Sequence, residues 1–377
     1  MNRNNSKTIY FDNAATTRVS DSVLEAVIPY LREQYGNPSS IYSLGRQSAT
    51  AIAKARTQVA NAIGCSPSEV YFTGGGSESN NWAIRWFDSV ITSEFEHHAV
   101  LHVCTNPTLL PVYANGIVRP EDLERALAEN PDTQLVTIMT VNNEIGTVQP
   151  IADLGTICKN AGVLFHTDAV QAVGSVPIDV QSMNVDLLSL SAHKFHGLKG
   201  VGALYIRKGV KLPSFIVGGA QESNLRAGTE NVAGIVGLGV AIEEAVSGLQ
   251  SKNEQLLEKR ERILKTVMQL PKVRLNGDLE RRVASNLNFS FEGIEGEALL
   301  LQLDFKGIAA SSGSACTSGS LDPSHVLLAL GLPHEIAHGS LRISMSKYTT
   351  DEEVDYLLKE LPPIIEKLRA MSPIWRD

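Results

Sequence analysis

The stretch Val163-Leu164-Phe165-His166-Thr167-Asp168-Ala169-Val170-Gln171 begins as an apolar run and reaches an acidic residue at its end. Apolar runs of this kind are typical of strands that are buried on both faces of a parallel sheet. In open α/β sheets, ligands bind at the carboxyl ends of such strands. A carboxylate at Asp168 could there hold a ring nitrogen protonated, although on this residue alone an aspartate that caps the next helix is the better explanation.

Strand-like and helix-like stretches alternate on both sides of this segment through the first two thirds of the chain. Strands are expected at residues 69–73, 90–92, 134–141, 163–166, 186–191 and 202–207, and helices at 21–33, 48–63 and 151–161. This alternation predicts an α/β layer that is built on a mostly parallel sheet.

After Gly219 the pattern changes. One or two long helices are expected over 231–269, then strands at 274–275, 286–291 and 308–310, with helices at 297–303, 324–330 and 351–371. This is an α+β pattern, and it places a domain boundary near residue 255. We expect a large domain over 15–255, and a small domain made of 1–14 and 256–377.

Composition narrows the classes of function. The 377 residues carry a formal net charge of −8, with 43% apolar and 20% charged residues, as in an ordinary globular enzyme. A diffuse acidic balance argues against a nucleic-acid groove, which needs clustered Lys and Arg. No apolar run approaches bilayer-spanning length, and residues 1–7 lack the apolar core of a signal peptide. We therefore expect a cytoplasmic protein with neither nucleic acid nor membrane as a partner.

The four cysteines do not form a metal or disulfide pattern. Cys65, Cys104 and Cys158 have apolar neighbours, which is typical of buried thiols, and CxxC spacing is absent. Cys316 differs, because the stretch 309–320 around it consists mostly of small residues. Such a segment is expected to be mobile and exposed. A thiol there is suited to move between a buried substrate and an external acceptor, and an incidental surface thiol is the less favoured alternative.

A glycine-rich stretch, Thr73-Gly74-Gly75-Gly76-Ser77-Glu78, follows one expected strand and precedes a helical stretch. Glycines let backbone N–H groups approach an anion, and a helix N-terminus favours negative charge. Ser77 adds a hydroxyl. A simple strand-to-helix turn explains the stretch equally well, and it matches neither the P-loop nor the dinucleotide pattern.

Lys194 ends the apolar run Leu187-Leu188-Ser189-Leu190-Ser191-Ala192-His193, 26 residues after Asp168. A partly desolvated lysine has a lowered pKa and reacts with aldehydes. On this residue alone, a lysine at a strand end that reaches for solvent is the better explanation. Together, however, an anion cradle, a carboxylate and an amine are the parts that a pyridoxal phosphate (PLP) site needs.

Ordered motifs run through almost the whole chain: FDNAATT (11–17), YGNPSS (35–40), EHHAV (96–100), VNNEIGTVQP (141–150), HTDAVQAVG (166–174), SAHKFHGLKGVGALY (191–205), RAGTEN (226–231) and SSGSACTSGSLDPSHVL (311–327). With these motifs the chain resembles the cysteine desulfurases of the nitrogen-fixation and iron–sulfur-assembly type. The resemblance implies a homodimer with the type I PLP-dependent transferase fold, in which a seven-stranded, mostly parallel sheet forms the large domain. It also implies conversion of L-cysteine to L-alanine, with a persulfide formed on Cys316.

The resemblance also implies roles for single residues. Lys194 matches the lysine that binds PLP covalently, Asp168 the partner of its ring nitrogen, and Gln171 the donor to its ring hydroxyl. His97 matches the histidine that stacks on the ring and assists acid–base catalysis. The implied phosphate contacts are Gly76, Ser77, Ser191, His193 and, from the other subunit, Thr229. The implied groups at the substrate carboxylate are Arg342 and Asn143, the latter also beside the cofactor, and the nucleophile is Cys316.

Several alternatives stay open. A selenocysteine lyase or an aminotransferase would share the scaffold, and a binding protein could keep PLP only for stability. A zinc hydrolase built on His97, His98 and Asp168 is less favoured, because adjacent residues on a strand face opposite sides. The sulfur acceptor is also open: an iron–sulfur scaffold protein, or a thiamine or tRNA sulfur pathway. The tail 367–375 resembles the scaffold-contacting end of the family, which does not name the partner.

Overall fold

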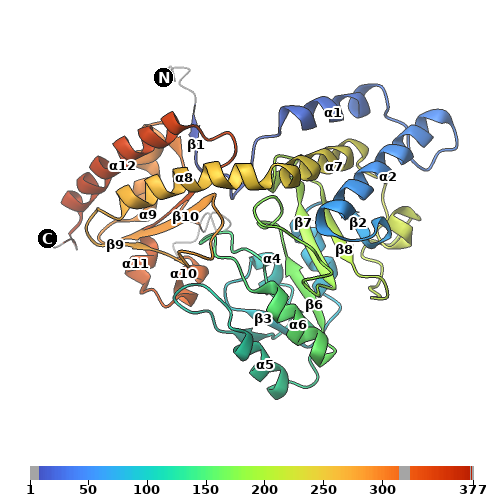
Figure 1. Ribbon diagram of the computed structural model, residues 1–377, viewed down its shortest axis with the longest axis horizontal. Helices are drawn as coiled ribbons and strands as arrows, with labels where there is room; N and C mark the ends of the chain where they lie inside the picture. The colour runs from blue at the N-terminus through green and yellow to red at the C-terminus, as the bar shows by residue number, and fades with distance from the viewer. Residues whose placement is uncertain (1–7, 314–322, 374, 376–377) are drawn as a thin grey trace.

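A mixed seven-stranded sheet forms the centre of the larger part of the molecule (Figure 1). The computed structural model describes residues 8–313, 323–373 and 375. In space the strands follow the order β2-β8-β7-β6-β5-β3-β4, and β8 runs antiparallel to both of its neighbours. The strands are β2 (Val70–Thr73), β3 (Val90–Ser93), β4 (Thr108–Leu110), β5 (Leu135–Thr137), β6 (Leu164–Asp168), β7 (Leu187–Ser191) and β8 (Gly202–Ile206). The predicted α/β class with a mostly parallel sheet is confirmed.

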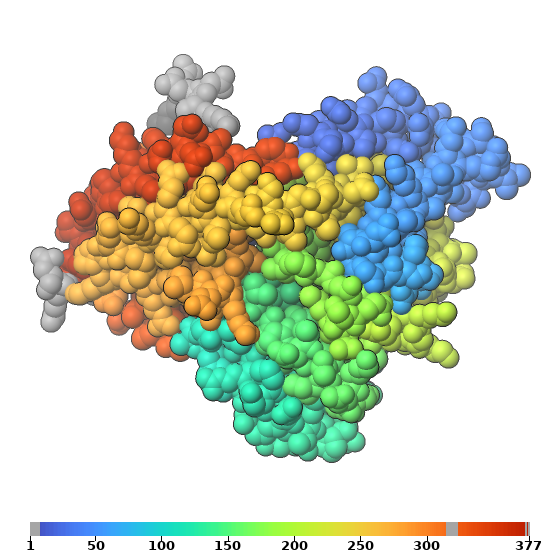
Figure 2. Space-filling view, viewed as in Figure 1, coloured from blue at the N-terminus to red at the C-terminus, as the bar shows by residue number. Residues whose placement is uncertain are grey.

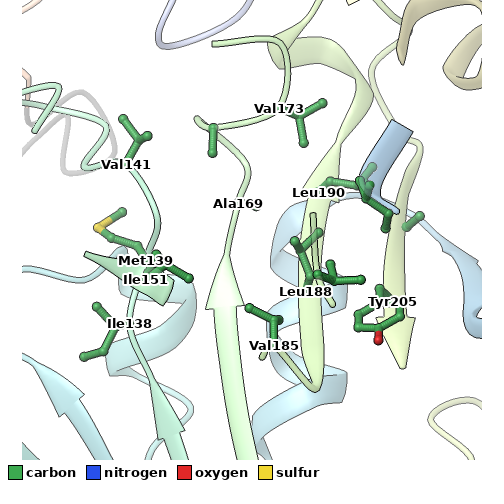
Figure 3. Packing of buried hydrophobic residues seen from close by; sticks show 14 of the residues in the cluster. Ile138, Met139, Val141, Ile151, Ala169, Val173, Val185, Leu188, Leu190 and Tyr205 are labelled. Carbon is green, nitrogen blue, oxygen red and sulfur yellow. The ribbon is translucent and has the colours of Figure 1, made fainter. Parts of the chain in front are cut away.

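Both faces of this sheet are buried, which explains its continuous apolar runs. Leu188 and Leu190 of β7 face one hydrophobic cluster, and Leu187 faces another on the opposite side, because successive side chains of a strand alternate. Figure 3 shows Leu188 and Leu190 close to Tyr205 of β8. Every residue of β7 and β8 is buried.

Helices cover both faces of the sheet. In this part of the chain they are α1 (Asp21–Arg32), α2 (Ser43–Ile63), α3 (Gly76–Ile84), α4 (His98–Leu101), α5 (Pro120–Glu129), α6 (Ile151–Ala161) and α7 (Val232–Ser247), with 3₁₀ turns η1 (Pro67–Glu69), η2 (Ala192–Lys194) and η3 (Gln221–Asn224). Helices α1 and α2 pack against α7, whereas α3 contributes Trp82 and Ile84 to the cluster on the other face. Helices α2 and α6 end at Gly64 and Gly162, where φ is +74° and +70°.

A second unit has two small sheets and its own core. Its strands are β1 (Ile9–Tyr10), β9 (Val273–Leu275), β10 (Asn286–Phe291), β11 (Ile308–Ala309) and β12 (Ser340–Ser344). Strand β10 pairs antiparallel with β9 and β12, and β1 pairs parallel with β11. The helices are α8 (Leu249–Val267), α9 (Gly296–Phe305), α10 (His325–Ala329), α11 (His334–His338) and α12 (Asp351–Met371). A capping box formed by Thr350 and Glu353 starts α12.

Helices α7 and α8 connect the two units (Figure 1), and Figure 2 shows them in yellow across both. They meet at Gly248 with a bend of 68°. Leu256 of α8 packs in the second core, one residue after the expected boundary at 255. We propose the division into 15–255, and 1–14 with 256–377, on this packing. No single helix in the described ranges has the length and apolarity to cross a membrane; the bent pair α7 and α8 meets that test only jointly.

The structure has elements that the sequence did not predict, among them β4, α5 and α11, and it differs at two places that border the site. The strand expected over 134–141 is limited to Leu135–Thr137, and an irregular segment follows it up to α6. Hydrogen bonds of Asn142 with the backbone of Glu144 and Ile145 shape this segment. Strand β12 was not predicted. Its five residues, Ser-Leu-Arg-Ile-Ser, are too few for a clear period, and their burial comes from pairing with β10.

Candidate active site

A cavity of about 400 Å³ lies at the carboxyl ends of β6 and β7. Among the described residues, all of the predicted site residues except Thr229 line it. Cys316 lies outside the described residues. Gly313, the last described residue before Cys316, does line the cavity. The size falls within the range of sites that enclose small molecules.

Asp168 is the last residue of β6 and is 4% exposed. Its Oδ2 accepts a hydrogen bond from Nδ2 of Asn80 at 2.6 Å, and its Oδ1 accepts one from the backbone N–H of Val170 at 2.9 Å. The backbone contact closes a turn after β6, and no helix begins in the described stretch between β6 and β7, so Asp168 is not the helix cap that was the alternative explanation. Asn80 orients the second oxygen. No described residue forms a hydrogen bond with the buried Oδ1 of Asn80. The polar edge of a ring bound in this cavity would face the Asp168 carboxylate and the Asn80 amide, which these hydrogen bonds orient.

Lys194 stands in turn η2, directly after β7. Its Nζ donates to the carbonyl oxygens of Ala14 at 2.6 Å and Ala15 at 2.9 Å. Nε2 of Gln171 donates to the same Ala14 oxygen at 2.9 Å. Gln171, which was predicted to donate to the ring hydroxyl of the cofactor, thus donates to a backbone carbonyl group in this structure. The stretch after β1 therefore forms one wall of the cavity. These carbonyl groups could not be identified from the sequence, because a pattern of side chains does not indicate which backbone groups accept hydrogen bonds.

The N-terminus of α3 forms the end of the site that suits an anion. Gly75 precedes it with φ +145°, and a Cβ on Gly202 of β8 would lie 2.8 Å from the Cα of Gly75. The loop thus packs directly on the sheet and leaves backbone N–H groups near the hollow beside Ser77. Burial lowers the pKa of His193, at the rim, to about 4, and the charges of Lys194 and Lys199 act in the same direction.

His97 is the N-cap of the short helix α4. Its Nδ1 accepts a hydrogen bond from the backbone N–H of Ala99 at 3.0 Å, so a neutral ring carries its proton on Nε2. Burial lowers the pKa of His97, which Asp168 opposes and Lys194 reinforces. The neutral imidazole is suited to exchange a proton inside the cavity.

Arg342 on β12 is 2% exposed and forms the opposite wall. Its Nη2 forms an ion pair with Oδ1 of Asp12 at 2.6 Å, and its Nη1 donates to the carbonyl oxygen of Asn143 at 3.0 Å. Within the described part of the chain, its buried Nε has no hydrogen-bond partner. A guanidinium has five N–H donors, so this one keeps donors for a carboxylate. Asn143 contributes its backbone to this contact, and Asp12 was not predicted.

Thr229 does not line this cavity. It is exposed and borders a separate hollow of about 180 Å³ with Gly74 and Gly228. The role implied for it lies on the other subunit's cofactor, and that remains a prediction. Among the described cysteines, burial raises the pKa of Cys65, Cys104 and Cys158 to about 12. These three thiols are therefore poor nucleophiles.

The residues required for a zinc site do not converge in the described ranges, where no group of three or more His, Cys, Asp or Glu could hold a metal ion. The ring of His98 instead lies 4.8 Å from that of His102 and 4.6 Å from that of His325. The donor set in the cavity fits PLP: an amine, a carboxylate, an anion cradle and an orphaned guanidinium N–H are arranged around one space.

Comparison with known proteins agrees with this site. The family model "Aminotransferase class-V" matches residues 9–357, and enzymes of that class use PLP. The chain is 53% identical to the cysteine desulfurase IscS of Methanosarcina thermophila, over 98% of this chain and 94% of that protein. It is 50% identical to the IscS of Clostridium botulinum (strain Hall), over 98% of each. The chain belongs to the cysteine desulfurases of the aminotransferase class-V family.

Solved structures show the same fold. A NifS-like protein superposes with a TM-score of 0.89 at 40% identity, covering 96% of this chain and 100% of the other. A structure titled "SspA in complex with cysteine" gives a TM-score of 0.79 at 36% identity, covering 90% and 99%. The expected type I PLP-dependent fold and the cofactor are confirmed.

We expect the free energy of unfolding of this protein to depend on pH through His166, which lies two residues before Asp168. His166 is fully buried, and burial lowers its pKa to about 3, from about 6.5 in an unfolded chain. Between these values the unfolded state binds a proton that the native state excludes, so this residue lowers the free energy of unfolding as pH falls. In the wild type, His166 should decrease the free energy of unfolding by about 1.4 kcal/mol for each pH unit below pH 6.5. This pH-dependent decrease should be absent from His166→Gln.

Urea unfolding of the holoprotein at pH 7.5, 6.0 and 5.0 measures this slope. The variant should be less stable than the wild type at pH 7.5, because it disrupts the contacts of His166 with Thr137 and Ser189. The difference should shrink as pH falls. The matched control is His334→Gln, at an exposed histidine, which should run parallel to the wild type. Parallel curves for His166→Gln would contradict the assignment.

Proposed function

We propose that this chain converts L-cysteine to L-alanine, takes the sulfur as a persulfide on Cys316, and delivers it to iron–sulfur cluster assembly. The observation that carries the proposal is the single cavity shared by Lys194, Asp168 and Arg342, with Gly313 in its wall. The named relatives are cysteine desulfurases, and one structural neighbour is titled as a complex with cysteine.

Cys316 follows Gly313 by three residues. Three residues of chain span at most about 11 Å. This short tether supports delivery of the Cys316 thiol to a substrate inside the cavity. None of the other described cysteines lies within three residues of a residue that lines the cavity, and burial raises the pKa of their thiols.

Each residue then has a defined task. PLP, when bound, supplies an electron-withdrawing ring next to the substrate Cα. With PLP bound, Lys194 would hold its aldehyde group and would move the Cα proton, and Asp168 would face the ring nitrogen. Arg342 binds the substrate carboxylate through its remaining N–H donors. His97 donates or accepts a proton through Nε2.

The sulfur step is balanced without an added oxidant or reductant. The Cys316 thiolate attacks the substrate sulfur, because the thiolate is the nucleophilic form. An S–S bond forms, the Cβ–S bond of the substrate breaks, and Cβ takes up a proton to become the methyl group of alanine. The protein is left with a persulfide that a thiol acceptor can remove.

We also propose a homodimer and a cytoplasmic location. Several large apolar side chains on and after α1 are exposed, namely Leu24 (50%), Leu31 (65%), Tyr35 (71%) and Ile41 (90%). Large exposed apolar surfaces mark interaction sites. A second copy on this surface agrees with the implied role of Thr229 on the other subunit. The acceptor protein is an iron–sulfur scaffold in this proposal, and other sulfur carriers are the alternative.

The test uses purified holoprotein, L-cysteine and excess dithiothreitol. Alanine and sulfide should appear in a ratio of about one to one, as the balanced step requires. L-Serine, which lacks the sulfur, should give no alanine. Pyruvate in place of alanine would contradict the proposal and indicate β-elimination. Formation of 3-mercaptopyruvate without sulfide would also contradict it and would favour an aminotransferase. Turnover of L-selenocysteine at least as fast as that of L-cysteine would favour the selenocysteine lyase instead.

A further inference from the structure

Glu144 contacts both described ends of the segment 314–322, which contains Cys316. It is 3% exposed and lies in the irregular stretch between β5 and α6. Its Oε2 accepts a hydrogen bond from the hydroxyl of Ser324 at 2.5 Å. A Cβ placed on Gly313 would lie 2.8 Å from the same Oε2. One buried carboxylate is therefore hydrogen-bonded to the chain after this segment and lies beside the chain before it.

Glu144 is itself held by both units of the fold. Its backbone N–H donates to Oδ1 of Asn142 at 2.9 Å, within the large unit. Its carbonyl oxygen accepts from Nδ2 of Asn288 at 3.2 Å, and Asn288 pairs in register with Arg342 on β12. The carboxylate thus has a fixed position relative to the residue that binds the substrate carboxylate.

The chain before Cys316 is anchored in the same place. The backbone of Ser311 exchanges hydrogen bonds with Arg342, at 2.6 and 3.4 Å, and Oγ of Ser311 accepts from the N–H of Gly313 at 3.1 Å. Gly313 has φ +102°, a conformation that side chains rarely adopt. The close approach to Glu144 and the backbone conformation both require glycine here.

The chain after the segment is anchored independently. Ser324 caps α10 by accepting from the N–H of Leu327, so one hydroxyl joins the helix to Glu144. Nε2 of the next residue, His325, lies 2.9 Å from the carbonyl oxygen of Glu96, which precedes His97. The start of α10 is therefore hydrogen-bonded to the part of the cavity wall that contains His97.

The two connections to Cys316 differ in length. Cys316 lies three positions after Gly313 and eight positions before Ser324, which allows at most about 11 Å and about 28 Å. Because the connection to Gly313 is the shorter one, the position of Gly313 restricts the region that the Cys316 thiol can reach more than the position of Ser324 does. A misplacement of about 1 Å can cost about 100-fold in rate when two groups must react.

We propose that Glu144 is a positioning residue for sulfur transfer, which fixes the chain on both sides of Cys316 and thereby sets the approach of its thiol to the substrate. The inference rests on the proposed role of Cys316. It assigns Glu144 to the sulfur step and not to the binding of cofactor or substrate.

The experiment compares Glu144→Ala and Glu144→Gln holoprotein with the wild type. One equivalent of L-cysteine is added without reductant, and the persulfide on Cys316 is followed over time by alkylation and mass spectrometry. Glu144→Ala should form it at least about 10-fold more slowly. Glu144→Gln should stay within about 3-fold, because its amide oxygen can still accept from Ser324. The change in cofactor absorption on adding L-cysteine should keep the same half-saturation in all three proteins.

A buried glutamate far from the cavity provides the control. Glu69 is 7% exposed and accepts from the N–H groups of Ser66 and Lys208, so Glu69→Ala removes a comparable carboxylate. It should leave the rate unchanged. If Glu144→Ala does not fold, Ser324→Ala and Ser324→Thr replace it, and only the threonine hydroxyl should restore the rate.

Two results would overturn the inference. One is a wild-type rate of persulfide formation in folded Glu144→Ala. The other is a Glu144→Ala protein that forms no persulfide and whose cofactor absorption no longer changes when L-cysteine is added. Glu144 would then be needed for binding in the cavity and not for the sulfur step alone. Failure of the proposed function looks different, since the wild-type protein itself would then form no persulfide on Cys316.

Discussion

Lys194→Ala holoprotein preparations should lack the visible absorption of bound cofactor and should release no measurable alanine, at least about 10³-fold below the wild type. Lys194 is the amine that turn η2 places in the cavity wall. Alanine has no group that can bind the cofactor aldehyde or move the Cα proton, and loss of general acid–base action alone costs about 10²–10⁴-fold. Absorption spectroscopy and alanine quantification measure both effects.

The fold should survive this substitution. Lys194 donates to the carbonyl groups of Ala14 and Ala15, and Gln171 still satisfies the first of them. A lost hydrogen bond of this kind costs about 1 kcal/mol, so circular dichroism and size should be unchanged. Lys194→Arg separates charge from covalent binding and should be equally inactive. Lys208→Ala, at an exposed lysine beyond β8, is the control. Retained alanine release in Lys194→Ala would refute the role of this lysine.

The sequence predicted the parts of the site that stand at ends of long apolar strands. Asp168 and Lys194 follow β6 and β7, which are neighbours in the sheet, so their convergence follows from the parallel topology. Gly76 and Ser77 follow from the same rule, because β2 leads into α3. For these residues a local pattern and one topological rule predict where the side chains lie, whereas their individual roles came from the family resemblance.

Other parts depend on contacts that no local pattern reports. Arg342 was identified through the family resemblance alone, since strand β12 has only five residues and reaches the cavity by pairing with β10. Asp12 and Asn80 were missed because their roles are to orient Arg342 and Asp168, which are distant in sequence. Glu144 belongs to the same class. Residues that position other residues become visible only when the chain is folded.

Cys316→Ser is expected to separate the two halves of the reaction. The holoprotein should keep its cofactor absorption, because Lys194, Asp168 and the N-terminus of α3 surround the cavity independently of Cys316. Sulfide release from L-cysteine with dithiothreitol should fall at least about 10³-fold. The serine hydroxyl is not ionised near neutral pH, whereas a thiol has a pKa of about 8.5 and supplies thiolate. Added L-cysteine should still change the cofactor absorption, since Arg342 is unaffected.

The other cysteines supply the matched controls for this variant. Cys65→Ser and Cys104→Ser replace half-buried thiols whose pKa burial raises to about 12, and both should release sulfide at the wild-type rate. Alkylation of the wild type after one turnover should place the extra sulfur on the peptide that contains Cys316. Full sulfide release by Cys316→Ser would move the sulfur acceptor elsewhere, and because the remaining thiols are largely protonated at neutral pH, the reductant itself would then be the nucleophile.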